Sequence, residues 1–175
     1  MAQAFTPLEG GCNCGSVRYR IVAEPMTVHC CHCTYCQRET GTAFTTHIAI
    51  EPENVTLLGE EPVAFKLAAA SGLPQERFLC GKCGVNVWSH YGSYGPTLIT
   101  LKVGTLDHPE FAPPRFHIYT STKQPWVTLP KDLPEFEGDY DPMKEWPEDK
   151  AKRLVPVRAK AEAYRAGLEK ADKGS

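Results

Sequence analysis

Seven of the eight cysteines in this chain of 175 residues occur in three short clusters with the spacing of metal ligands. The clusters are Cys12 and Cys14, then Cys31, Cys33 and Cys36, and then Cys80 and Cys83. Four thiolates complete the tetrahedral coordination of a zinc ion, whereas three leave one position open. If the two pairs share one zinc, the triplet holds a second zinc with an open position. This asymmetry favours an enzyme over a fold that metal only stabilises.

The two pairs have the features of structural ligands. A short Cys-x-Cys or Cys-x-x-Cys turn delivers two sulfurs to one metal, and backbone N–H groups of the turn can hydrogen-bond the thiolates. Gly11, Gly15, Gly81 and Gly84 lie in or beside these turns, where the chain must bend tightly. A zinc shared by both pairs would tie the first strand to the middle of the chain.

The triplet favours a different chemistry. Three thiolates around a divalent zinc leave a net negative charge, so the centre is a poor Lewis acid for making hydroxide. It can accept a further soft ligand, and a thiol is the natural one. Coordination lowers the pKa of that thiol, while the negative centre keeps its sulfur electron-rich. We therefore predict delivery of a thiolate to an electrophilic carbon.

A fourth protein ligand would instead close the triplet site and make both zincs structural. The candidates are Cys30, His29, His32 and His47. Cys30 is adjacent to Cys31, but on a strand that leads into the turn the alternation of side chains would point it away from Cys31.

Charge and hydropathy argue against several classes of partner. A net charge of −2 gives no general attraction to nucleic acid or to an anionic membrane. No stretch approaches the ~18 consecutive apolar residues of a membrane span, and the first residues do not resemble a signal peptide. We expect a cytoplasmic protein, in which reducing conditions favour metal ligation over the alternative, a framework of disulfides.

The pattern of apolar residues predicts a body made mainly of β-strands. Residues 17–21 and 44–50 show the period of two that is typical of a half-buried strand. Further short segments rich in β-branched and aromatic residues are 54–58, 62–67, 76–80, 85–90, 97–103 and 116–120.

The last part of the chain has a different composition. Residues 125–147 are rich in proline, acidic and aromatic residues, and we expect them to wrap the body as an extended segment. A helical stripe follows, formed by Leu154, Val157, Ala161, Tyr164 and Leu168. The helix is expected to dock on the body or on a second subunit in a homo-oligomer, with Pro156 in its first turn and not in its interior.

Motifs around the cysteines extend the pattern. They are Gly11-Cys12-Asn13-Cys14-Gly15, Val17-Arg18-Tyr19, Cys31-His32-Cys33-Thr34-Tyr35-Cys36-Gln37-Arg38, Phe78-x-Cys80-x-x-Cys83-Gly84, Gly104-Thr105-Leu106-Asp107, His117-Ile118 and Pro125-Trp126. In this order, over roughly residues 8–140, they resemble the glutathione-dependent formaldehyde-activating enzyme family, the Gfa-type domain that also occurs in centromere protein V.

The resemblance implies an Mss4-like fold, a complex of short antiparallel sheets with two zinc sites. We therefore expect a zinc-binding β domain over residues 1–140 and a helical C-terminal extension over residues 141–175. Carried over residue by residue, the resemblance implies a structural zinc on Cys12, Cys14, Cys80 and Cys83, and a catalytic zinc on Cys31, Cys33 and Cys36. The founding activity of the family makes and cleaves the carbon–sulfur bond of S-(hydroxymethyl)glutathione, the adduct of glutathione and formaldehyde.

Few other side chains are singled out by their position. Arg38, directly after the triplet, is the best-placed cation for a carboxylate of a glutathione-like thiol, and an ion pair within the protein is its simpler alternative. His117 is expected to be a core or edge histidine and not a catalytic one. The aromatic residues expected to pack in the core are Phe65, Trp88, Phe116 and Trp126.

Together these features predict a zinc-dependent carbon–sulfur lyase that acts on adducts of a low-molecular-weight thiol and a small aldehyde such as formaldehyde. Cys31, Cys33 and Cys36 would be ligands, and the attacking sulfur would belong to the substrate. The alternatives are a non-catalytic binding module with two structural zincs and a thiol or metal sensor whose zinc is released on oxidation. The sequence has no basic stripe that would support nucleic-acid binding.

Overall fold

A computed structural model describes residues 5–68 and 74–173 and confirms a fold that is mainly β with a C-terminal helix. The strands are β1 Leu8–Gly11, β2 Arg18–Ile21, β3 Thr27–Cys31, β4 Thr45–Ile50, β5 Val55–Leu57, β6 Val63–Ala68, β7 Pro74–Leu79, β8 Asn86–His90, β9 Ile99–Lys102 and β10 Phe116–Ile118. The helices are α1 Thr34–Thr40, α2 Pro142–Glu145 and α3 Glu148–Lys173, and short 3₁₀ turns occupy Pro52–Asn54, Gly95–Thr97, Val103–Thr105, Pro109–Phe111 and Thr120–Thr122.

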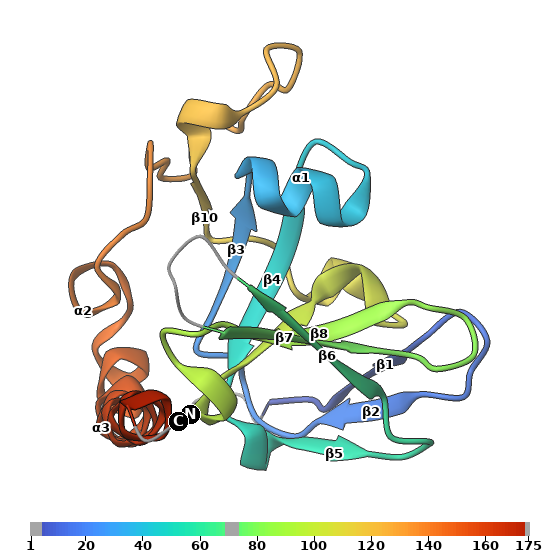
Figure 1. Cartoon of the computed structure of the whole chain (residues 1–175). Helices are drawn as coiled ribbons and strands as arrows, with labels where there is room; N and C mark the ends of the chain where they lie inside the picture. The colour runs from blue at the N-terminus through green and yellow to red at the C-terminus, as the bar shows by residue number, and fades with distance from the viewer. Residues whose placement is uncertain (1–4, 69–73, 174–175) are drawn as a thin grey trace.

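The strands form a small and a large sheet (Figure 1). The small sheet has the order β1-β2-β5, and the large one has the order β10-β3-β4-β9-β8-β7-β6. Neighbouring strands of both sheets are antiparallel apart from β10, which pairs with β3 in parallel and places His117 beside Cys30. This parallel pair joins segments that are far apart in the sequence. It gives β3 a hydrogen-bonded neighbour on each edge, β10 on one and β4 on the other.

The large sheet has a core on each of its faces. On one face, Ile48 packs with Tyr19 and Ile21 of the small sheet. On the other, Ala49 packs with Leu154 and Val157 of α3. Because successive residues of a strand point to opposite faces, Cys30 belongs to the first face, and Cys31 lies in the second core. The sheet is therefore the middle of three layers.

The structure confirms part of what was predicted for the C-terminal region: an extended stretch beside the body and a helix with a buried stripe, although the short helix α2 lies within the stretch expected to be extended. Residues 134–138 run beside β10, with backbone hydrogen bonds between His117 and both Pro134 and Phe136. In α3, Leu154, Val157 and Ala161 of the expected stripe are buried. The helix is further held by ion pairs of Lys150 with Glu24 and of Arg153 with Glu51.

Two sequence predictions about this region and the core are wrong. Pro156 lies inside α3 and not in its first turn, because the helix begins earlier, at Glu148; the missing N–H leaves one hydrogen bond of the helix unmade. Trp88 and Phe116 are buried as expected, but Trp126 is 73% exposed and Phe65 is 60% exposed. Phe65 lies on β6, the last strand of the large sheet, so it has a neighbouring strand on one side only.

No helix in the described ranges is long and apolar enough to cross a membrane.

Candidate metal centres

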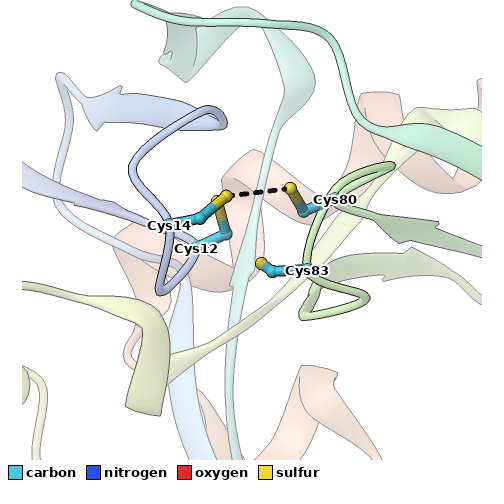
Figure 2. A group of neighbouring side chains, drawn as sticks. All are labelled: Cys12, Cys14, Cys80 and Cys83. Atoms are coloured by element: carbon cyan, nitrogen blue, oxygen red, sulfur yellow. Dashed lines mark hydrogen bonds between the residues drawn. The ribbon is translucent and has the colours of Figure 1, made fainter.

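The two cysteine pairs come together between the sheets (Figure 2). Cys12 and Cys14 lie in the turn between β1 and β2, and Cys80 and Cys83 lie in the turn between β7 and β8. The four sulfurs all lie within 4.8 Å of one another, with Sγ–Sγ distances of 3.5 Å for Cys12–Cys14 and 3.6 Å for Cys14–Cys80. Two sulfurs on one tetrahedral zinc lie about 3.8 Å apart, because each Zn–S bond is about 2.3 Å. The group therefore has the spacing of a four-thiolate zinc site.

The same backbone arrangement presents both pairs. The N–H of Cys12 donates to Val17 O at the first turn, and the N–H of Cys80 donates to Val85 O at the second. Gly15 and Gly84 follow the second and fourth cysteines with φ of 77° and 74°, a left-handed conformation that glycine adopts without a steric penalty. The glycines that follow Cys14 and Cys83 in the sequence are therefore explained by the left-handed backbone that each turn adopts.

The triplet is presented by the junction of a strand and a helix. Cys31 ends β3, Cys33 is the N-cap of α1, and Cys36 lies within α1. The N–H of Cys36 donates to Cys33 Sγ at 3.3 Å, so a sulfur caps the helix where a hydroxyl or carboxylate usually does. The three sulfurs lie within 4.8 Å of one another. Their donor set and spacing fit a divalent zinc with three protein ligands.

The electrostatics of the triplet lower the pKa of one sulfur and raise the pKa of the other two. Hydrogen bonds with Cys31 and Cys36 lower the pKa of Cys33 to about 2. Hydrogen bonds with Cys33 and Cys36, together with burial, raise the pKa of Cys31 far above its ordinary value. Negative charge is thus concentrated on Cys33, whose side chain is partly exposed. A bound cation would spread that charge over all three sulfurs.

None of the four alternative ligands joins the three sulfurs. Cys30 and His32 fall on the other side of β3 in a separate group of ligand atoms. His47 comes closest, with its Nε2 3.5 Å from Cys36 Sγ, but it is not among the mutually close atoms of the triplet group. His29 stacks on Phe116, with 6.1 Å between the ring centroids. Within the described residues, the group of mutually close ligand atoms at the triplet therefore consists of the three sulfurs, with His47 at its edge.

A buried charged network stands behind the triplet, and the sequence did not reveal it. Lys102 Nζ lies 2.9 Å from Glu39 Oε1, and Arg77 lies 3.4 Å from the same carboxylate. The Lys102 and Glu39 side chains are only 7% and 3% exposed. A hydrogen bond with Cys31 lowers the pKa of Cys36, but the contact with Cys33 and burial outweigh it and raise that pKa to about 12, a rise that the positive charge of Lys102 opposes. Burial first, and then the charge of Lys102, keep the pKa of His47 well below its usual value. One signal was available, because a lysine inside an apolar strand is unusual unless it is paired.

Arg38 lines an open depression beside α1. The depression has a volume of about 630 Å³, and it is lined by Thr34, Gln37, Arg38, Gly41, Thr42, Ala43, Gln124 and Trp126. In the parts of the chain that the structure describes, no carboxylate lies within 4.0 Å of Arg38, so the expected ion pair is not formed there. Gln37 anchors the wall by donating to the carbonyls of His32 and Thr122.

Comparison with known proteins identifies the family. The family model described as glutathione-dependent formaldehyde-activating enzyme matches residues 7–122, a range that contains all seven clustered cysteines, and the chain therefore belongs to this family. A Halomonas elongata protein provisionally named glutathione-dependent formaldehyde-activating enzyme is 28% identical over 127 residues, covering 70% of this chain and 80% of that protein. A crystal structure of a Rhodobacter sphaeroides protein is similar over 73% of this chain and 98% of its own, with 14% identity and a TM-score of 0.45.

Proposed function

We propose that this member of the glutathione-dependent formaldehyde-activating enzyme family is a carbon–sulfur lyase, with Cys31, Cys33 and Cys36 as the ligands of its catalytic zinc. The substrates would be a low-molecular-weight thiol such as glutathione and a small aldehyde such as formaldehyde. The observation that carries the proposal is the group of three mutually close sulfurs that Cys30, His29, His32 and His47 do not join. Cys12, Cys14, Cys80 and Cys83 would hold a second, structural zinc.

A zinc ion held by the triplet would supply an open position that favours ionisation of an incoming thiol. The reaction is balanced without a further reactant. The thiol sulfur forms a bond to the carbonyl carbon, the carbonyl π bond breaks, and the thiol proton ends on the new hydroxyl. Cleavage is the reverse of these changes.

The chain's own residues would position the reactants. The three cysteines would remain ligands and would not attack the aldehyde. Arg38, exposed at the wall beside α1 and free of a carboxylate partner in the described structure, would bind a carboxylate of the thiol substrate. Gln37 donates hydrogen bonds to the carbonyls of His32 and Thr122, and it would thereby hold α1 in place against the segment that follows β10.

The C-terminal extension would support the site without contributing to the chemistry. Residues 141–175 lie outside the matched range, which ends at residue 122. Trp146, Leu154 and Val157 of this extension share a core with Cys31 and Cys36. We propose that the extension stabilises the wall behind the triplet.

The decisive experiment replaces zinc with cobalt and titrates glutathione while the thiolate-to-metal charge-transfer band is recorded. We expect a saturable change at one of the two proposed metals, and no change with S-methylglutathione, which lacks the thiol. Cys33→Ser should abolish the response. An unchanged spectrum with wild type would mean that the sites are closed, and it would favour a binding module.

A second assay separates an enzyme from a sensor. Exchange between formaldehyde and S-(hydroxymethyl)glutathione can be followed by NMR with and without protein, because the uncatalysed reaction sets the baseline. The lyase requires acceleration that increases with protein concentration and is lost in Cys33→Ser. A sensor would respond to glutathione or to oxidation by releasing metal and would leave the exchange rate at its baseline.

A further inference from the structure

A third group of metal-ligating side chains lies on the face of β3 opposite the triplet. It consists of Cys30, His32 and His117, which are 2%, 0% and 6% exposed. His32 Nε2 is 3.6 Å from Cys30 Sγ and 2.9 Å from His117 Nδ1. The three ligand atoms all lie within 4.8 Å of one another. No role in the proposed reaction uses them.

The parallel pairing of β10 with β3 creates this group. Cys30 and His117 are register partners, and the N–H of His32 continues the pairing by donating to Ile118 O. Cys30 and His32 are two residues apart in an extended segment, so their side chains point to the same face. Cys31, between them, points to the face of the triplet. The backbone therefore presents ligands to both sides of one strand.

The distances suit a tetrahedral divalent cation. With bonds of about 2.3 Å to sulfur and about 2.0 Å to nitrogen, two ligands lie about 3.6 Å apart for S···N and about 3.3 Å apart for N···N. The Cys30–His32 distance of 3.6 Å meets the first value. The His32–His117 distance of 2.9 Å is that of an N–H···N hydrogen bond, and it would lengthen slightly around a metal.

Hydrogen bonding alone does not satisfy the group. His32 Nε2 faces both Cys30 and His117, and a single proton on that nitrogen can serve only one of them. A cation bound through the inner nitrogens would place the proton of each ring on the outer nitrogen, His32 Nδ1 or His117 Nε2, and both of these are buried without a hydrogen-bond partner in the described structure, so they do not decide between the two arrangements. A cation at the centre would be bound by all three inner atoms at once.

We propose that Cys30, His32 and His117 form a third metal site, which takes a borderline divalent cation such as Zn²⁺ through one thiolate and two imidazole nitrogens. This donor set suits zinc better than hard cations such as Mg²⁺ or Ca²⁺. Binding releases the proton of the Cys30 thiol. A metal here would hold β10 against β3, independently of whether the triplet is catalytic.

The test uses the zinc-loaded full chain and X-ray absorption at the zinc edge. The two other proposed sites have cysteines as their only proposed protein ligands, so the part of an imidazole signal that His117→Gln removes belongs to the third site. We expect that signal in wild type and its loss in His117→Gln. His108→Gln removes a histidine that lies on the surface next to Glu110, and it should leave the signal unchanged.

Metal analysis provides the second readout. Cys30→Val and His117→Gln should each lose about one zinc per chain, and Cys33→Ser should lose a different zinc, so that combining Cys30→Val with Cys33→Ser removes about two. A wild-type spectrum without imidazole scattering would overturn the proposal, whether or not any variant folds. So would a zinc content and spectrum unchanged by His117→Gln. Neither result depends on lyase activity, so failure here is distinct from failure of the proposed function.

Discussion

The four-cysteine group and the triplet use the same ligand atom in opposite surroundings. The four-cysteine group is built from two turns, and its Cys14 and Cys83 are exposed. The triplet is built from one strand–helix junction, with Cys31 and Cys36 buried against a core and a charged network. A structural zinc needs little more than its ligands, whereas a reactive centre also depends on the groups behind those ligands. The comparison suggests that substitutions around the triplet, and not only in it, will alter function.

The largest expected effect is a loss of catalytic activity when a cysteine of the triplet is replaced. Cys33→Ser should reduce thiol–aldehyde exchange to the uncatalysed rate, because one of the three proposed ligands of the catalytic zinc is lost. It should also remove about one zinc per chain and leave the circular dichroism spectrum that of a folded protein. Full activity in this variant would contradict the assignment of the triplet as the catalytic centre.

Replacing a cysteine of the four-cysteine group should instead lower the stability of the fold. Cys80→Ser removes a buried cysteine that we propose as a ligand of the zinc joining the two sheets, so we expect the free energy of unfolding to fall by more than about 3 kcal/mol. Chemical denaturation measures this loss. Molecules that remain folded should keep their response to glutathione. If Cys80→Ser abolished that response without a loss of stability, the roles of the two groups would be reversed.

A smaller effect tests the charged network. Lys102→Met leaves the buried Glu39 carboxylate with Arg77 as its remaining cation, which should cost about 2–4 kcal/mol of stability. It should also weaken zinc binding at the triplet more than at the four-cysteine group, because the positive charge of Lys102 opposes the rise in the pKa of Cys36. In the double variant Lys102→Met, Glu39→Gln, part of the stability should return. A single variant that is as stable as wild type would exclude a buried pair.

Acidification should loosen the layer that covers the triplet. Burial raises the pKa of Glu51, but hydrogen bonds from Arg153 of α3 outweigh it and hold the pKa below its usual value. A carboxyl whose folded-state pKa is lowered stabilises the fold above its unfolded pKa of about 4.3, and this contribution is lost as the pH falls through the folded pKa.

Glu51→Gln provides the matched comparison for this pH dependence. At neutral pH it should lower stability by about 2 kcal/mol, the scale of a hydrogen bond to a charged group. Its stability should depend less on pH than that of wild type in the acid range. Parallel pH profiles for the two proteins would show that the contact of Glu51 with Arg153 does not anchor α3.

The smallest effect concerns substrate binding. Arg38 is exposed, so Arg38→Ala should remove no more than about 1 kcal/mol, which is a rise of up to about five-fold in KM for glutathione. The value of kcat should remain close to that of wild type, because the contact is remote from the reacting atoms. Arg38→Lys should restore part of the binding. If the KM rises equally for cysteamine, which has no carboxylate, Arg38 does not recognise that group.

The sequence predicted what depends on local pattern. Strands such as β2 and β4 follow from alternation over a few residues. Both sulfur groups follow from short cysteine spacings, which are combined with glycine turns in the four-cysteine group. Helix α1 was missed because its seven residues form no apolar stripe and a cysteine caps it. The parallel partner of β3, the pair of Lys102 with Glu39 and the approach of His117 to Cys30 all depend on contacts across the chain, which no local pattern encodes.

Exposed aromatic side chains illustrate the same limit. The type of Trp126 and Phe65 favours burial, but the place of each in the structure leaves more than half of it in solvent. Aromatic composition predicts that a residue can be buried, and topology decides whether it is. The depression that Trp126 lines beside Arg38 could therefore not be anticipated from the sequence.

The spacing of the ligands also sets an order of events during synthesis. Cys14 and Cys80 are 66 positions apart, whereas the triplet lies within a run of six residues, so closing the longer loop around a metal costs about 2 kcal/mol more entropy. At about 5–20 residues per second, Cys83 leaves the ribosome a few seconds after Cys36. During that interval Cys12 and Cys14 can compete as extra ligands for a zinc captured by the triplet. We expect the yield of correctly metallated protein to depend on how fast zinc is supplied relative to translation.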